Sequence, residues 1–242
     1  MKGKAKWLAI PLALSMLAGL CGCSSGEGAT GTVTMAETNP EFFQYEIISE
    51  TASIRITDYN GTDSVVVIPA EFEERKVTAI GEGAFEGNQV ITEVVIPDTV
   101  TEIEDEAFYN SNLEKITLPK SLTQIGNTAF GKTSLTEIEI PEGTVNIKSN
   151  AFRESELINV SLPATLETIG GSAFCNNSIE EIYIPESVTS IGNVTEYMLN
   201  SRSSNFSSLN QPAFDNGITM RGKSGSFAET YANFQNYTFI TE

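Results

Sequence analysis

The stretch LEKITLPKSLTQIGNTAF, residues 113–130, contains the pattern that determines the fold. Close copies of it follow one another along the chain, each with one proline and an Ala-Phe pair at its end. The phenylalanines, spaced by 23, 22, 22 and 22 residues, are Phe85, Phe108, Phe130, Phe152 and Phe174. The prolines recur every 22 residues at Pro97, Pro119, Pro141, Pro163 and Pro185. A fixed period of this length predicts a repeat protein in which each copy forms one coil.

Each part of the unit has a physical role. Ile116 and Leu118 alternate with polar residues, which predicts a short strand with one buried face. Pro119 lacks an N–H and fixes φ, so we expect it to end the strand. Phe130 would fill the interior of its coil, and successive phenylalanines would stack into a spine. A glycine suited to a bend with an unusual φ follows in most copies, at Gly81, Gly126, Gly170 and Gly192.

This unit resembles the BspA-like class of leucine-rich repeats, whose pattern is leucine-x-x-isoleucine-x-isoleucine-proline with a final alanine-phenylalanine. The resemblance covers about residues 43–240. It implies a β-rich solenoid, a right-handed coil of about 22 residues per repeat. The asparagine usual in other leucine-rich repeats is absent, and its place is taken by Thr99, Ser121, Gly143, Thr165 and Ser187. Hydroxyls there could satisfy backbone groups of the turn, but Gly143 could not.

Both ends of the array resemble caps. Alternating apolar residues in segments 43–47, 54–56 and 65–69 predict an N-terminal β-hairpin that covers the first coil. The dipeptide Asn60-Gly61 is a hairpin signal, which we favour over a calcium loop because the acidic spacing does not match an EF-hand. At the other end, residues 218–240 predict a strand-helix-strand cap in which Ser226 caps the helix and Glu229 completes a capping box. Its apolar face would be formed by Ala228, Tyr231, Ala232 and Phe234.

The N-terminus has the pattern of an export signal. Three lysines at positions 2, 4 and 6 precede an apolar run at residues 7–20, which is too short to span a bilayer. The run ends in Leu20-Cys21-Gly22-Cys23, which resembles a bacterial lipobox with Cys23 as the lipidated residue. The alternative is a plain secretory signal with two incidental cysteines. Lipidation would place the protein on the extracellular side of the bacterial cell membrane, which it would contact only through the anchor.

The predicted organisation has six segments. They are a signal peptide at 1–22, a flexible tether at 23–40, an N-terminal cap at 41–76, leucine-rich repeats at 77–193, an insertion at 194–212, and a last partial repeat with the C-terminal cap at 213–242. The insertion follows from the last Ala-Phe pair, because Phe214 lies 40 residues after Phe174 instead of 22. Insertions in solenoids often carry recognition, so Tyr197, Arg202 and Phe206 are candidate contacts. The alternative is a local lid over the C-terminal coils.

The amino-acid composition excludes several classes of function. The chain has no histidine, which excludes Ser-His-Asp catalysis and the common histidine metal sites. A net charge of −18 repels nucleic acid and should keep the protein monomeric and soluble. The sequence therefore predicts no catalytic residues, no metal and no cofactor. After processing, Cys175 would be the one remaining thiol, which we interpret as a partly buried small residue.

Outward strand positions should form a side-chain array on the concave face. Period-two geometry gives a first column of Glu93, Lys115, Glu137, Asn159 and Glu181. The second column is Val95, Thr117, Glu139, Ser161 and Tyr183. This array is mostly acidic and polar, with Tyr183 as its aromatic anchor. A partner with basic features could dock there; the alternative is an ordinary solvated sheet face.

The resemblance implies a surface protein, because BspA-like proteins are found on mucosal and gut microbes and several are adhesins for host matrix or other bacteria. We therefore expect a non-enzymatic adhesin or recognition module that binds a protein ligand. Carbohydrate binding on the concave face is the first alternative, which rows of aromatic residues would support. A passive scaffold that presents the 194–212 insertion is the second.

Overall fold

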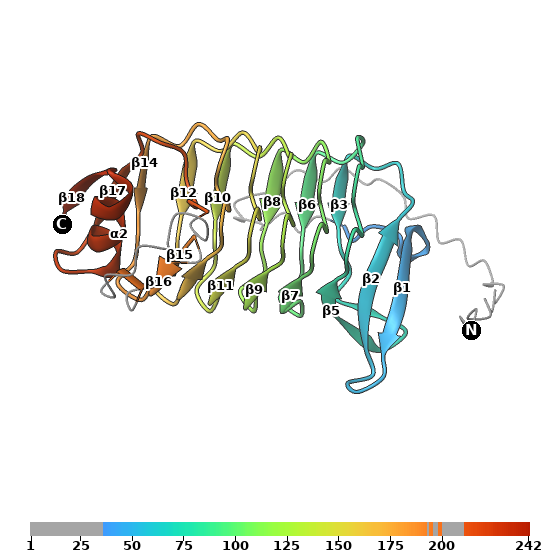
Figure 1. Cartoon of the computed structure of the whole chain (residues 1–242). Coiled ribbons are helices and arrows are strands. Elements are labelled where there is room, and N and C mark those ends of the chain that lie inside the picture. Colours follow the sequence, from blue (N-terminus) through green and yellow to red (C-terminus); the bar gives the residue numbers. More distant parts are fainter. Residues whose placement is uncertain (1–35, 193, 196–197, 200–210) are drawn as a thin grey trace, which may run out of the picture. The chain divides into compact units, whose positions relative to one another are not determined.

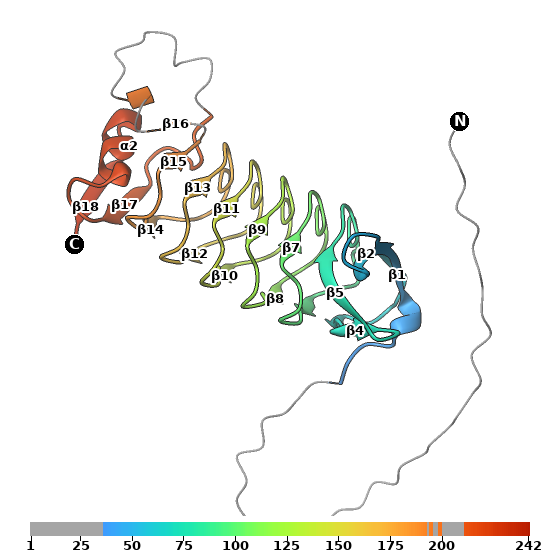
Figure 2. The same cartoon turned by 90° about the horizontal axis from the view of Figure 1, so that it is seen from below.

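The computed structural model describes residues 36–192, 194–195, 198–199 and 211–242. The predicted signal peptide, most of the predicted tether and most of the insertion lie outside these residues. In the part that is described, no helix is both long enough and apolar enough to cross a membrane. The described chain is a solenoid of short coils whose strands lie side by side (Figures 1 and 2).

Each repeat coil contributes one strand to a front face and one to a second ladder. The front strands, here called the front ladder, lie side by side as three short parallel sheets: β3 (Val65–Val67), β6 (Glu93–Val95) and β8 (Lys115–Thr117); β10 (Glu137–Glu139) and β12 (Asn159–Ser161); and β14 (Glu181–Tyr183), β17 (Thr219–Gly222) and β18 (Thr238–Thr241). The second ladder consists of β5 (Arg75–Ile80), β7 (Glu102–Ile103), β9 (Gln124–Ile125), β11 (Asn146–Ile147), β13 (Thr168–Ile169) and β15 (Ser190–Ile191). Neighbouring coils pair in parallel, for example Ile147 with both Ile125 and Ile169. The predicted solenoid with a 22-residue repeat is confirmed.

The phenylalanines form the predicted spine. Rings from Phe85 to Phe214 stack face to face, with centroids 4.8–5.4 Å apart and interplanar angles of 4–10°. Tyr59 of the N-terminal cap continues the stack, with its ring centroid 5.5 Å from that of Phe85. The Phe108, Phe130 and Phe152 side chains are fully buried. Stacking therefore buries a ring that a single coil would leave exposed.

The N-terminal cap is the predicted hairpin, but with a different turn. A short 3-10 helix, η1 (Pro40–Phe42), precedes β1 (Phe43–Ile48), which pairs antiparallel with β2 (Ser53–Tyr59) through a turn at residues 49–52. The prediction that Asn60-Gly61 forms the hairpin turn is wrong, because this dipeptide links β2 to β3, which lies in the other ladder. A Cβ on Gly61 would lie 2.2 Å from the Tyr59 hydroxyl oxygen, so glycine leaves room for that ring.

The remaining cap elements close both ends of the core. On the N-terminal side, β4 (Glu71–Phe72) pairs antiparallel with β5, and Phe72 packs against the ring of Phe43. On the C-terminal side, β16 (Val194–Thr195) pairs antiparallel with β15. Beyond it, β17, the helix α2 (Phe227–Gln235) and β18 form the predicted strand-helix-strand cap.

Helix α2 shows the expected cap with two differences. The Ser226 hydroxyl accepts a hydrogen bond from the Glu229 amide at 3.4 Å, as predicted. The Glu229 carboxylate accepts from the amide of Gly225, one residue before the position that a capping box uses. Tyr231 and two alanines of the helix are buried as expected. Phe234, expected on the packed face, is 41% exposed because it lies on the solvent side of the helix.

Most of the hydroxyls that replace the usual asparagine form hydrogen bonds with backbone groups, as expected. Thr99, Ser121 and Thr165 each donate to a backbone carbonyl of the preceding coil. The Gly143 amide instead donates to the Thr165 hydroxyl at 2.9 Å. The Ser187 hydroxyl is buried without a hydrogen-bond partner among the described residues. Neighbouring coils are thus connected through side chains as well as through the strand ladders.

The repeat glycines serve close packing, not the unusual φ that we predicted for them. Among the four, only Gly192 has a positive φ, of 60°. A Cβ on Gly126 would lie 2.4 Å from the carbonyl carbon of Glu104, and one on Gly170 would lie 2.4 Å from the amide nitrogen of Ser149. The backbone of the preceding coil therefore occupies the space that a side chain would need.

Gly126→Ala is expected to lower the free energy of unfolding by about 1–3 kcal/mol, because two coils must move apart to admit the methyl group. Chemical denaturation followed by circular dichroism measures this loss. Gly87→Asn is the control: Gly87 has a φ of 66°, which asparagine tolerates, and a Cβ at this residue would have no atom within 4 Å. Coincident unfolding curves for Gly126→Ala and the unmodified protein would contradict the close-packing explanation.

Candidate functional site

The front ladder places the predicted columns in register. Glu93 pairs with Lys115, and Glu137 pairs with Asn159, in the first column. In the second column Val95 pairs with Thr117, and Glu139 pairs with Ser161. The ladder then continues past the insertion, because Glu181 pairs with Thr219 and Tyr183 with Arg221. The alternation of apolar and polar residues causes this arrangement, since Ile138 and Ile182 between these positions point into the core.

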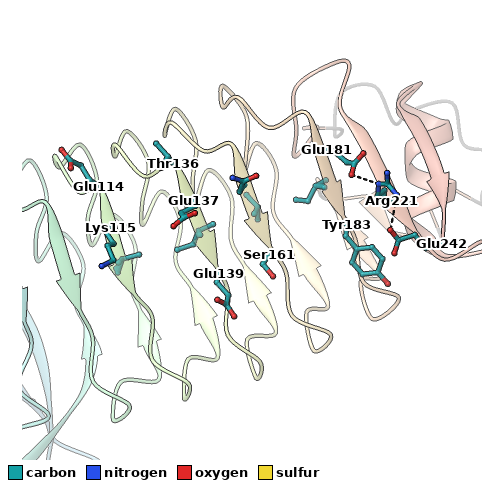
Figure 3. Close-up of a pocket in the computed structure, with 15 residues that line it drawn as sticks. Glu114, Lys115, Thr136, Glu137, Glu139, Ser161, Glu181, Tyr183, Arg221 and Glu242 are labelled. Atoms are coloured by element: carbon teal, nitrogen blue, oxygen red, sulfur yellow. Dashed lines mark hydrogen bonds and ion pairs between the residues drawn. The ribbon is translucent and has the colours of Figure 1, made fainter. Parts of the chain in front are cut away.

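A groove runs over the C-terminal half of this face (Figure 3). It has a volume of about 750 Å³ and is open to solvent. Seven of the ten predicted positions line it, namely Lys115, Glu137, Glu139, Asn159, Ser161, Glu181 and Tyr183. The other three predicted positions, Glu93, Val95 and Thr117, lie on the same ladder but outside the groove.

Sequence reasoning missed four polar residues of the groove, which are Glu114, Thr136, Arg221 and Glu242. Glu114 and Thr136 immediately precede their strands, where we expected no contact. Arg221 lies beyond the insertion, which interrupts the 22-residue register. The alternation in Thr219-Met220-Arg221 was the available signal, because Met220 is fully buried while Arg221 faces outward.

In the part of the chain that the structure describes, ion pairs engage side chains at both ends of the groove but none at its centre. The Lys115 ammonium lies 2.9 Å from a Glu93 carboxylate oxygen. The Arg221 guanidinium lies 2.6 Å from Glu181 and 3.4 Å from Glu242, and the hydrogen bond that Arg221 donates to Glu181 raises the pKa of Arg221 (Figure 3). Among the described residues, no ion pair involves Glu137 or Glu139 of β10. The centre of the groove therefore carries two carboxylates without a cation.

An aromatic ring lies in the same groove, two strands beyond these carboxylates. Tyr183 is 44% exposed and lies in the same column as Glu139, two strands further along (Figure 3). On its other side, the register places Arg221 and then Ile240, which is 38% exposed. The groove thus combines free carboxylates at β10 with an exposed aromatic ring at β14, which suits recognition better than acid-base chemistry.

Other carboxylates of the repeats are engaged in structural contacts. Glu104 accepts from Arg55 at 2.6 Å, and Glu102 accepts from the Gln124 side chain. In the described part of the chain, no group of three or more histidine, cysteine, aspartate or glutamate side chains is placed to hold a metal ion.

The other candidate residues are those of the insertion and Cys175. Tyr197, Arg202 and Phe206 of the insertion fall outside the described residues. The described residue Leu199 packs against the core. Cys175 is partly buried, its thiol contacts the Pro212 carbonyl oxygen at 3.3 Å, and burial raises the pKa of that thiol. A raised pKa disfavours the reactive thiolate form.

Comparison with known proteins identifies the repeats. The family model described as BspA type leucine rich repeat region matches six copies within residues 78–203, which is more than half of the chain. The chain belongs to this family. No curated protein matches this BspA-type chain.

Solved structures of bacterial repeat proteins are similar to this BspA-type chain. The T. pallidum leucine rich repeat protein TpLRR is 28% identical with a TM-score of 0.61, over 66% of this chain and 84% of that protein. The pneumococcal vaccine antigen PcpA is 23% identical with a TM-score of 0.56, over 67% of this chain and 47% of that antigen. The second likeness shows the fold alone, and this chain spans about half of the antigen's length.

Proposed function

We propose that this BspA-type protein is a non-enzymatic surface lipoprotein that binds a protein partner with basic side chains through the groove of the front ladder. The observation that carries the proposal is the pair of unneutralised carboxylates, Glu137 and Glu139, on the floor of a groove that also exposes Tyr183. Family membership supports a role at the cell surface. It also favours an adhesin or recognition module over an enzyme.

Charge supports a basic partner. The chain carries 32 acidic and 14 basic residues, so its field attracts cationic surfaces and repels anionic ones. Complementary charge raises the rate of encounter and excludes partners of the same sign. Carbohydrate binding has less support, because Tyr183 is the single aromatic residue among those that line the groove.

Replacing Glu139 and Tyr183 together with alanine is expected to weaken binding of the partner by about tenfold or more, since a central aromatic anchor and a charged contact are both lost. The full chain, in mild non-ionic detergent, would be screened against host matrix proteins and a glycan array at physiological salt. Surface plasmon resonance would then compare each hit with the double variant.

The matched control replaces Glu86 and Val90 with alanine, since both are exposed and lie outside the groove. Equal affinity of the two double variants for a protein hit would exclude the groove as its binding site. Glycan hits alone would favour the carbohydrate alternative. No hits of either kind would favour the passive scaffold.

Lipid anchoring has its own test. Cys23→Ser is expected to abolish acylation and move the protein from the detergent phase to the aqueous phase in a phase-partition assay, because the thiol that takes the lipid is lost. Cys21→Ser is the control and should stay in the detergent phase. Retention of Cys23→Ser in the detergent phase would contradict the assignment of Cys23.

A further inference from the structure

We propose that the groove takes a peptide segment of the partner in the polyproline II conformation, in which a lysine or arginine and an aromatic or large apolar residue are three positions apart. The basic side chain would lie between Glu137 and Glu139, and the apolar one would pack on Tyr183. This inference rests on the proposed function and specifies the ligand of the same groove.

The spacing follows from the ladder. Glu139, Ser161 and Tyr183 occupy one column on the three successive strands β10, β12 and β14. In the same three coils, the stacked rings of Phe152, Phe174 and Phe214 have centroids 5.3 and 5.4 Å apart. This coil spacing is close to that of neighbouring strands, so the carboxylate and the ring are separated by about 10 Å along the solenoid. A polyproline II segment advances about 3.1 Å per residue and completes one turn in about three residues, so side chains three positions apart face the same side and lie about 9 Å apart. The segment would therefore lie across the strands, along the solenoid axis.

The charge pattern selects where the cation binds. Lys115 is held by Glu93 at 2.9 Å, and the acids at the other end are held by Arg221. Glu137 and Glu139 are two positions apart on β10, so both side chains point into the groove. A single ammonium or guanidinium group between them can donate hydrogen bonds to both carboxylates, and charge-assisted hydrogen bonds of this kind are the strong ones.

The surface between the two anchor points suits a peptide backbone. Asn159 and Ser161 line the groove on β12, between the carboxylates and the ring. Their amide and hydroxyl groups both donate and accept hydrogen bonds, which matches the N–H and C=O groups of a polyproline II segment, since that conformation leaves its backbone groups without internal partners. At the far end, Tyr183 and Ile240 flank Arg221 in register and present exposed apolar surface. Because the groove is open, both chain directions fit it.

The test uses fluorescein-labelled octapeptides of glycine and serine that contain one lysine and one phenylalanine. These residues are placed one, three or six positions apart, in both orders, and binding to the full chain in mild detergent is measured by fluorescence anisotropy. We expect a three-position peptide, in at least one order, to bind about tenfold more tightly than the one-position and six-position peptides. Substituting its lysine by serine should remove most of this advantage.

Two groove variants separate the anchor points. Glu137→Gln with Glu139→Gln should weaken the three-position peptide by about tenfold and leave the serine-substituted peptide unchanged. Tyr183→Ala should weaken the three-position peptide but not a version with alanine in place of phenylalanine. Glu86→Gln with Glu156→Gln changes the net charge equally at exposed sites outside the groove, and it should have no effect.

Affinity that does not depend on spacing, or no binding by any peptide, would overturn the inference. If a protein partner still bound in a groove-dependent way, the proposed function would stand and only the spacing rule would fail. If the double replacement of Glu139 and Tyr183 with alanine also left the affinity for the protein partner unchanged, both the proposed function and the spacing rule would fail.

Discussion

Phe130→Ala is expected to lower the free energy of unfolding by about 3–5 kcal/mol, the range for removing a fully buried phenylalanine. The Phe130 ring is not exposed, and its centroid lies 5.2 Å from that of Phe108 and 5.1 Å from that of Phe152. Its loss opens a cavity in the middle of the spine and removes two stacking contacts. Because each coil contacts only its neighbours, both interfaces of the central coil weaken together.

Guanidinium chloride denaturation followed by far-ultraviolet circular dichroism measures this loss. A broadened or split transition would agree with the expectation, because a weakened central coil uncouples the two ends of the array. Phe234→Ala is the control: that ring is 41% exposed on α2, so its removal should cost less than about 1 kcal/mol. A loss below about 1 kcal/mol for Phe130→Ala as well would mean that the spine contributes little to stability.

The period of the sequence predicted much of the fold because it fixes which residues are equivalent. Once Ile116 is assigned to the buried side of a strand, Lys115 and Thr117 must face outward. The same assignment in every copy places Glu137, Glu139 and Tyr183 on one face. This reasoning needs no knowledge of long-range contacts, since equivalent positions of successive coils become neighbours.

Features that depend on contacts between non-equivalent residues were not predictable in this way. The role of Gly126 depends on the distance to the backbone at Glu104, which no local pattern encodes. Asn60-Gly61 is a locally strong turn signal, but the hairpin turns elsewhere because β3 pairs with β6 of the front ladder, a contact that local sequence does not encode. Arg221 joins the groove only because the chain returns to the ladder after the insertion.

The ion pairs of the groove also required the structure. Sequence spacing alone makes Lys115 a neighbour of both Glu93 and Glu137, and it could have neutralised either one. The structure pairs it with Glu93 at 2.9 Å and leaves Glu137 without a cation among the described residues. The position of the unneutralised carboxylates, on which the proposed ligand depends, therefore comes from side-chain geometry.

Raising the pH from 10 to 12 is expected to destabilise the C-terminal cap. Tyr231 is fully buried, and burial raises its pKa from 10.0 to about 12. Burial also raises the pKa of Tyr237, whose hydroxyl donates to the Phe214 carbonyl oxygen at 2.9 Å. Because the folded-state pKa exceeds the unfolded value, this stabilisation is fully present below pH 10 and is lost as the pH rises toward 12. The shift at Tyr231 alone corresponds to about 3 kcal/mol.

Absorbance of tyrosinate near 295 nm and far-ultraviolet circular dichroism, recorded together during an alkaline titration, measure this effect. An absorbance step above pH 10 should coincide with loss of α2. Tyr59 of the N-terminal cap also has a pKa raised by burial, so Tyr231→Phe and Tyr237→Phe are needed to isolate the C-terminal contribution. Each variant should lose stability less steeply between pH 10 and 12, because phenylalanine cannot ionise. If all tyrosines ionised near pH 10 without loss of α2, the hydroxyls of Tyr231 and Tyr237 would have to be accessible to solvent, and the packing of the cap on the last Ala-Phe pair would be wrong.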